Sequence, residues 1–108
     1  MASRAIVKSV QNYLRAVAQQ GIPVRFGVLY GSYVKGKTHK WSDIDLLVIS
    51  PRYDKHCTHD DWTDLWVLAA HTDSRIEPIP VGEKQYEKTD SMIITIARRE
   101  GQIIPLAE

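Results

Sequence analysis

The sequence has 108 residues, of which 44% are hydrophobic and 25% are charged, and its formal net charge is +1. This length suits a single domain over residues 1–108, with little room for a second, acceptor-binding domain. The small net charge argues against a long nucleic-acid footprint, because such footprints depend on neutralising phosphates. No apolar run approaches the roughly 20 residues that cross a bilayer, so we expect no membrane contact.

The N-terminal segment is charged and amphipathic, and it lacks the apolar centre of a signal peptide. The sequence has one cysteine, Cys57, which excludes an intramolecular disulfide. Both features favour a reduced, cytoplasmic setting.

The first half of the chain predicts a helix followed by a strand and a turn. Apolar residues at three- and four-residue steps predict a helix over about 4–20, with Ser3 as its N-cap and Gly21 just after its end. Residues 24–30 read as a strand, and residues 32–37 suit a short helix that opens at the next turn.

The second half continues the alternation of helices and strands. The near-continuous apolar run 44–49 predicts a strand that is buried on both faces. We expect a helix over about 60–70, a third strand over 75–81 and a last helix over 91–100, followed by a short extended tail at 102–105.

This order predicts an α+β fold, in which helices pack on both sides of a small mixed sheet, like a sandwich. Pro78 and Pro80 argue against a central strand and favour either an edge position or an early end of the third strand, because proline cannot donate to a central ladder. Trp62 and Trp66 are one helical turn apart, and we expect them in the core.

Two carboxylates stand out at the start of the second strand. Asp43 and Asp45 are separated by one residue, a spacing that points both side chains to one face of a strand. Neighbouring carboxylates repel unless a cation lies between them, and burying them costs several kcal/mol without compensation. Hard oxygen ligands of this kind suit Mg²⁺ or Mn²⁺.

A phosphate-binding turn precedes these carboxylates. The backbone N–H groups of Gly31 and Ser32 and the Ser32 hydroxyl are suited to hold phosphate. Lys35 can add a positive charge nearby, although a solvated lysine is an equal alternative. His56, Cys57 and His59 invite a zinc interpretation, which we disfavour because no second ligand pair accompanies them.

Together, Gly31-Ser32, a ten-residue spacer and Asp43-Ile44-Asp45 resemble the signature of the DNA polymerase β-type nucleotidyltransferase superfamily. The short length resembles its minimal nucleotidyltransferase (MNT) branch. The resemblance covers nearly the whole chain and implies the polymerase-β-like nucleotidyltransferase fold. Lys35-Gly36 stands where many relatives have Arg-Gly, and lysine lacks the planar fork of arginine.

The resemblance implies a Mg²⁺-dependent transfer of a nucleoside monophosphate from an NTP to a hydroxyl group. Asp43, Asp45 and Glu77 take the catalytic and metal-binding roles. Gly31, Ser32, Tyr33 and Lys35 take the nucleotide-binding role. Asp73 and Glu83 are rival third carboxylates, since Pro78 leaves the direction of the Glu77 side chain open.

The same resemblance implies a partner. MNT proteins are commonly paired with a helical HEPN protein in a toxin–antitoxin system, in which the MNT antitoxin uses ATP to adenylylate a tyrosine of the HEPN toxin. A partner that supplies the acceptor would explain the absence of an acceptor domain.

Two other functions stay open. One is an antitoxin that neutralises its partner by binding alone, without catalysis. The other is a transferase that acts on a small molecule or an RNA end, with a separately encoded helical subunit. Self-association is also plausible, because an edge strand of a small sheet needs cover.

Overall fold

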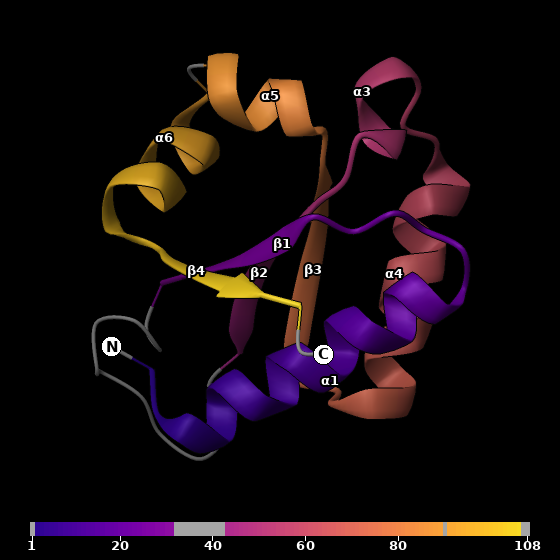
Figure 1. The fold of residues 1–108 in the computed structure, drawn as a ribbon, viewed down its shortest axis with the longest axis vertical. Helices are drawn as coiled ribbons and strands as arrows, with labels where there is room; N and C mark the ends of the chain where they lie inside the picture. The colour runs from indigo at the N-terminus through magenta and orange to yellow at the C-terminus, as the bar shows by residue number, and fades with distance from the viewer. Residues whose placement is uncertain (1, 32–42, 90, 107–108) are drawn as a thin grey trace.

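The computed structural model describes residues 2–31, 43–89 and 91–106 of the chain. Helices and strands alternate over these residues (Figure 1). The elements are α1 (Arg4–Gln19), β1 (Phe26–Tyr30), β2 (Ile44–Ile49), α3 (Arg52–Lys55), α4 (His59–Thr72), β3 (Ile76–Val81), α5 (Glu83–Lys88), α6 (Met92–Glu100) and β4 (Gln102–Pro105).

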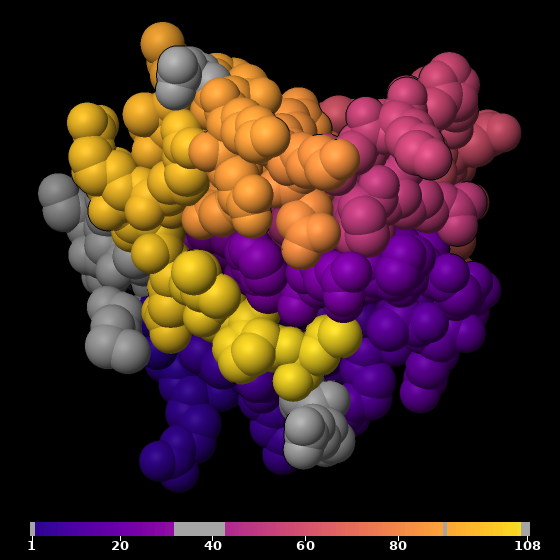
Figure 2. Space-filling view, turned by 45° about the horizontal axis from the view of Figure 1, so that its top comes forward, coloured from indigo at the N-terminus to yellow at the C-terminus, as the bar shows by residue number. Residues whose placement is uncertain are grey.

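The strands form one mixed sheet in the order β3-β2-β1-β4. Strand β1 is antiparallel to both β2 and β4, whereas β2 and β3 are parallel. The predicted α+β architecture with a small mixed sheet is therefore confirmed. The tail at 102–105 is extended as expected, but it also pairs with β1, a contact that the sequence did not predict. Figure 2 shows this C-terminal segment, in yellow, at the surface beside the N-terminal elements.

Alternate side chains of the buried strand β2 enter two separate cores. Ile44, Leu46 and Val48 pack with α1 and α4 on one face of the sheet. Leu47 and Ile49 pack on the other face with Ile94, Ala97 and other apolar side chains. In Figure 1, α5 and α6 lie at the top and upper left, apart from α4 on the right and α1 along the bottom. The strand is thus buried on both faces, as its apolar run predicted.

Most of the predicted helix ends are also confirmed. The side chain of Ser3 accepts a hydrogen bond from the Ile6 backbone N–H at the start of α1, and Gly21 follows the helix with a φ of 91°. Ser91 caps α6 in the same way. The short helix expected at 32–37 lies outside the described residues. Helices α3 and α5 were missed, because elements of four and six residues are too short to give a periodic pattern.

The prolines of β3 are at the sheet edge, as expected. The carbonyl oxygens of Arg75 and Val81 accept hydrogen bonds from β2 and from Ser50 just after it. Positions 75, 77, 79 and 81 therefore direct their backbone polar groups toward β2, and Pro78 and Pro80 fall on the outward positions. No ladder hydrogen bond is lost at either proline.

The placement of Trp62 and Trp66 in the core was wrong. Their side chains are 40% and 44% exposed. The buried residues of α4 are Asp61, Leu65 and Ala69 at four-residue steps, so residues one position later point outward. Asp61 can face inward because Thr58 donates to it and Arg52 pairs with it.

Among the described residues, no helix has both the length and the apolar character needed to span a membrane.

Candidate functional site

Tyr30, Asp45 and Glu77 lie side by side across three strands. Tyr30 of β1 is the register partner of Asp45 of β2, and Asp45 is the register partner of Glu77 of β3. Each belongs to the face of the sheet that carries Leu47 and Ile49, because side chains alternate along a strand. We call these three side chains the polar row. It lies at one end of the sheet, on the face where the apolar side chains of α6 pack.

Asp43 completes an acidic cluster at the end of this row. It comes directly before β2, and its side chain is exposed. The Asp43 and Glu77 side chains lie close enough that charge repulsion and a hydrogen bond between them both raise the pKa of Glu77. The structure therefore brings together the three acidic residues that the sequence motifs indicated, from two strands that a crossover separates in the chain.

The cluster is electrostatically unfavourable when it is fully ionised. Burial raises the pKa of Asp45, and the charge of Asp43 raises it further. Burial also raises the pKa of Glu77, followed by the charge of Asp43, their shared hydrogen bond and the charge of Asp45. Burial and the two carboxylates raise the pKa of Tyr30 to about 12. A cation that neutralises these carboxylates therefore stabilises the cluster.

The chemistry of this cluster suits a divalent cation. Its donors are carboxylate oxygens, the ligands that Mg²⁺ and Mn²⁺ prefer. As the side chains stand, no three His, Cys, Asp or Glu residues in the described ranges form an arrangement that would hold a metal ion. Cation binding by Asp43, Asp45 and Glu77 thus requires that their side chains turn toward a common point.

The turn after β1 lies directly against Asp45. Gly31 has a φ of 81°, a conformation that residues with a side chain rarely adopt. A β carbon at Gly31 would be 2.5 Å from Oδ2 of Asp45. The backbone conformation and the close approach of Asp45 both favour glycine at this position. These two observations explain the first residue of the Gly-Ser motif. The other residues predicted to bind nucleotide, Ser32, Tyr33 and Lys35, lie outside the described residues.

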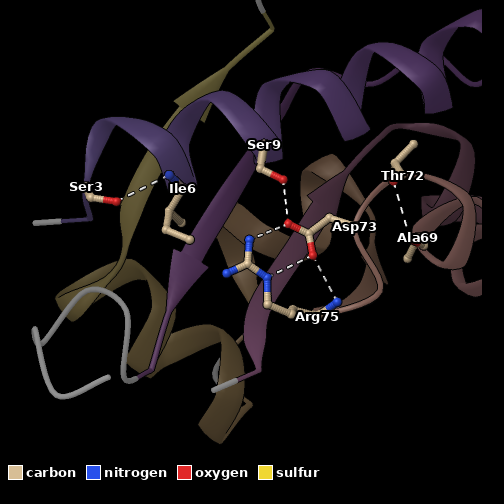
Figure 3. A network of polar contacts seen from close by, with 7 residues as sticks. All are labelled: Ser3, Ile6, Ser9, Ala69, Thr72, Asp73 and Arg75. Atoms are coloured by element: carbon tan, nitrogen blue, oxygen red, sulfur yellow. Dashed lines mark hydrogen bonds and ion pairs between the residues drawn. The ribbon is translucent and has the colours of Figure 1, made fainter. Parts of the chain in front are cut away.

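The rival third carboxylates are both engaged elsewhere. Asp73 accepts hydrogen bonds from the side chains of Ser9 and Arg75 (Figure 3). The Ser9 Oγ and the Arg75 Nη2 each lie 2.6 Å from Oδ2 of Asp73. These contacts hold the pKa of Asp73 well below its usual range, at about 2. Glu83 forms an ion pair with Arg25 at 3.3 Å. Glu77 is therefore the better placed of the three to act with Asp43 and Asp45.

Tyr30 is the member of the polar row that sequence reasoning missed. A signal was present, because Tyr30 has the same parity as Phe26 and Val28 along β1. The antiparallel register that sets it beside Asp45 depends on the turn between β1 and β2, and the sequence does not fix that register.

Comparisons with known proteins agree with this architecture. A family model described as a nucleotidyltransferase domain matches residues 10–103. A comparison with curated proteins finds no match.

Several solved structures share the fold. A toxin–antitoxin complex with AMP-PNP is 20% identical, with a TM-score of 0.63 over 91% of this chain and 74% of that chain. A putative nucleotidyltransferase from Sulfolobus solfataricus is 14% identical, with a TM-score of 0.62 over 90% and 77%. The complex of a tri-AMPylated HEPN toxin from Shewanella oneidensis with its MNT antitoxin is 18% identical, with a TM-score of 0.55 over 90% and 70%.

The family match covers most of the chain, and the fold is the one found in these nucleotidyltransferase and MNT structures. The chain therefore belongs to the nucleotidyltransferase domain family, as its Gly31-Ser32 and Asp43-Ile44-Asp45 motifs predicted.

Proposed function

We propose that this chain is a divalent-cation-dependent nucleotidyltransferase that transfers AMP from ATP to a tyrosine hydroxyl of a helical HEPN-type partner. In this role the chain is the antitoxin of a toxin–antitoxin pair. The observation that carries the proposal is the convergence of Asp43, Asp45 and Glu77 beside the Gly31 turn, in a chain of the nucleotidyltransferase domain family.

In the proposed reaction, the acceptor oxygen forms a bond to the α-phosphorus of ATP. The bond from that phosphorus to the bridging oxygen of the β-phosphate breaks, and pyrophosphate leaves. The hydroxyl proton passes to a carboxylate. We assign this transfer to a carboxylate of the acidic cluster formed by Asp43, Asp45 and Glu77.

The remaining parts of the site bind and orient the substrates. Asp43, Asp45 and Glu77 would hold Mg²⁺ or Mn²⁺, which would supply charge neutralisation at the phosphates and lower the pKa of the acceptor hydroxyl. Gly31, Ser32, Tyr33 and Lys35 are our proposed nucleotide contacts. The positive φ of Gly31 turns the chain directly over Asp45, so phosphates bound by this turn would lie beside the carboxylates.

Two solved structures support the choice of nucleotide and partner. One similar toxin–antitoxin complex contains AMP-PNP, an ATP analogue. In another, an MNT antitoxin is in complex with a tri-AMPylated HEPN toxin. Both proteins share the fold of this chain, which makes ATP and a HEPN-type protein the first substrates to test.

The test is label transfer from α-labelled ATP to the protein encoded beside this chain, in the presence of Mg²⁺. We expect a labelled partner band with the native chain and none with Asp43→Asn/Asp45→Asn. The matched control is Glu87→Gln, which neutralises an exposed carboxylate on α5 and should transfer label like the native chain.

Each alternative function has its own outcome in this assay. Co-purification and neutralisation that survive Asp43→Asn/Asp45→Asn, without label transfer from any NTP, would establish an antitoxin that acts by binding alone. Turnover on a small molecule or an RNA end without a protein partner would replace the HEPN acceptor by that substrate.

A further inference from the structure

A broad apolar groove runs along the outer side of α4, with a volume of about 780 Å³. Its lining includes His59, Trp62, Thr63, Trp66, Val67 and Ala70, and none of the described Asp, Glu, Lys or Arg side chains contributes to it. Val67 is 50% exposed, in addition to the two exposed tryptophans. Clustered exposure of large apolar side chains marks an interaction surface.

The groove and the polar row lie on opposite sides of the sheet. Helix α4 packs through Leu65 and Ala69 into the core that contains Ile44 and Leu46. Asp45 alternates with those strand residues and faces the other core. A molecule that fills the groove leaves the polar row open, whereas an acceptor for the polar row must approach from the other side.

We propose that the occupant of this groove is a second copy of the chain, with the two α4 helices antiparallel about a two-fold axis near Trp66. Such an interface is self-complementary, because each contact occurs twice. Around this axis Trp62 lies opposite Ala70 of the second copy, so the largest side chain of one helix meets the smallest lining side chain of the other. Trp66 lies opposite Trp66 and Val67.

Charge complementarity supports the antiparallel direction. The exposed Asp60 lies in the first turn of α4, and the exposed His71 lies in its last turn. At the helical step of 100° per residue, both fall on the same flank of the groove, next to Val67. The two-fold axis brings Asp60 of one copy beside His71 of the other, where the imidazole N–H can donate to the carboxylate. It also sets the positive end of each helix dipole near the negative end of its neighbour.

The first experiment measures the mass of the full chain by sedimentation equilibrium over a concentration series. We expect twice the 12.3 kDa chain mass for the native protein and the single chain mass for Trp66→Glu. The matched control is Ile103→Glu, at the 58% exposed Ile103 of β4, which should stay dimeric. Unchanged circular dichroism of both variants shows that they remain folded.

A charge swap tests the antiparallel register. Asp60→Lys and His71→Glu should each raise the dimer Kd about tenfold, because Asp60→Lys removes the carboxylate that accepts from the imidazole N–H and His71→Glu brings two carboxylates together, at both ends of the interface. The double variant Asp60→Lys/His71→Glu should recover a Kd close to the native value. If the two substitutions weakened the dimer only by disturbing the structure, their effects on Kd would instead add in the double variant.

Three results would overturn the proposal. A native chain that is monomeric over the whole concentration series has no second copy in the groove. A dimer that survives Trp66→Glu but is lost with Ile103→Glu pairs through the β4 edge. A monomer whose complex with the HEPN-type protein is lost with Trp66→Glu uses the groove for that protein.

Discussion

A β carbon at Gly31 would come within 2.5 Å of Oδ2 of Asp45. The first residue of the proposed nucleotide-binding turn and the central residue of the acidic cluster are therefore coupled by direct contact. A side chain at one position must displace the other.

We expect Gly31→Ala to weaken both folding and nucleotide binding. The left-handed backbone conformation costs a residue with a side chain about 1–2 kcal/mol, and the new methyl group displaces the Asp45 carboxylate. Gly21→Ala is the matched control, because Gly21 has a φ of 91° and a β carbon there would have no atom within 4 Å. Urea unfolding should show a similar loss for both variants, and titration with ATP and Mg²⁺ a loss for Gly31→Ala alone. Equal ATP affinity in the two variants would contradict the coupling.

Glu77 is expected to be required for activity, and Glu83 is not. Glu77→Gln removes one of the three carboxylates, and we expect label transfer to fall about a hundredfold or more. Glu83→Gln removes the partly exposed ion pair with Arg25 and should leave the transfer rate unchanged. Initial rates of the two variants at matched ATP concentrations measure this difference. The reverse order would assign the third position to Glu83.

The acidic cluster predicts an unusual pH dependence for the cation-free protein. The pKa values of Asp45 and Glu77 are raised above their ordinary values of 3.8 and 4.5, so the folded state binds their protons more tightly than the unfolded state does. Their contribution to stability is therefore present below those values and is lost as the pH rises through the raised pKa values. Asp45→Asn/Glu77→Gln should abolish this loss.

Urea unfolding over a pH series in a chelating buffer measures this effect. Adding Mg²⁺ at neutral pH should raise the free energy of unfolding of the native chain and not that of the double variant, because only the native cluster binds the cation. Parallel pH curves for the two proteins would contradict the prediction.

The contribution of Asp73 to stability has the opposite pH dependence. Its pKa is lowered to about 2, first by the hydrogen bond from Arg75, so its contribution is present above the ordinary value of 3.8 and is lost as the pH falls through about 2. At neutral pH we expect Asp73→Asn to lower the free energy of unfolding by about 1–3 kcal/mol. Ser9→Ala, which removes one hydrogen bond of this network (Figure 3), should cost about 1 kcal/mol. If Ser9→Ala lowered the free energy of unfolding more than Asp73→Asn does, the ion pair between Asp73 and Arg75 would contribute little.

The sequence was informative where a residue's role depends on its neighbours in the chain. The apolar run of β2, the cap at Ser3 and the edge position of the prolines are local features, and the structure has them all. The grouping of Asp43, Asp45 and Glu77 followed from the family resemblance.

The sequence was less informative where long-range pairing decides. The register that sets Tyr30 beside Asp45 depends on the strand pairing, and the pairing of residues 102–105 with β1 depends on where α6 returns the chain. Trp62 and Trp66 were misplaced for a related reason. Apolar character alone does not choose the buried stripe of α4, because that stripe includes Asp61, whose burial depends on its contacts with Arg52 and Thr58.

The outward positions of Pro78 and Pro80 also limit how the sheet can grow. A strand added beside β3 would find no N–H group at these two positions, so this edge is a poor template for another chain. Glu77 lies next to these outward positions. The strand that is protected against edge-to-edge aggregation is therefore the one that carries a proposed catalytic carboxylate. Strand addition is thereby confined to the opposite edge of the sheet, at β4.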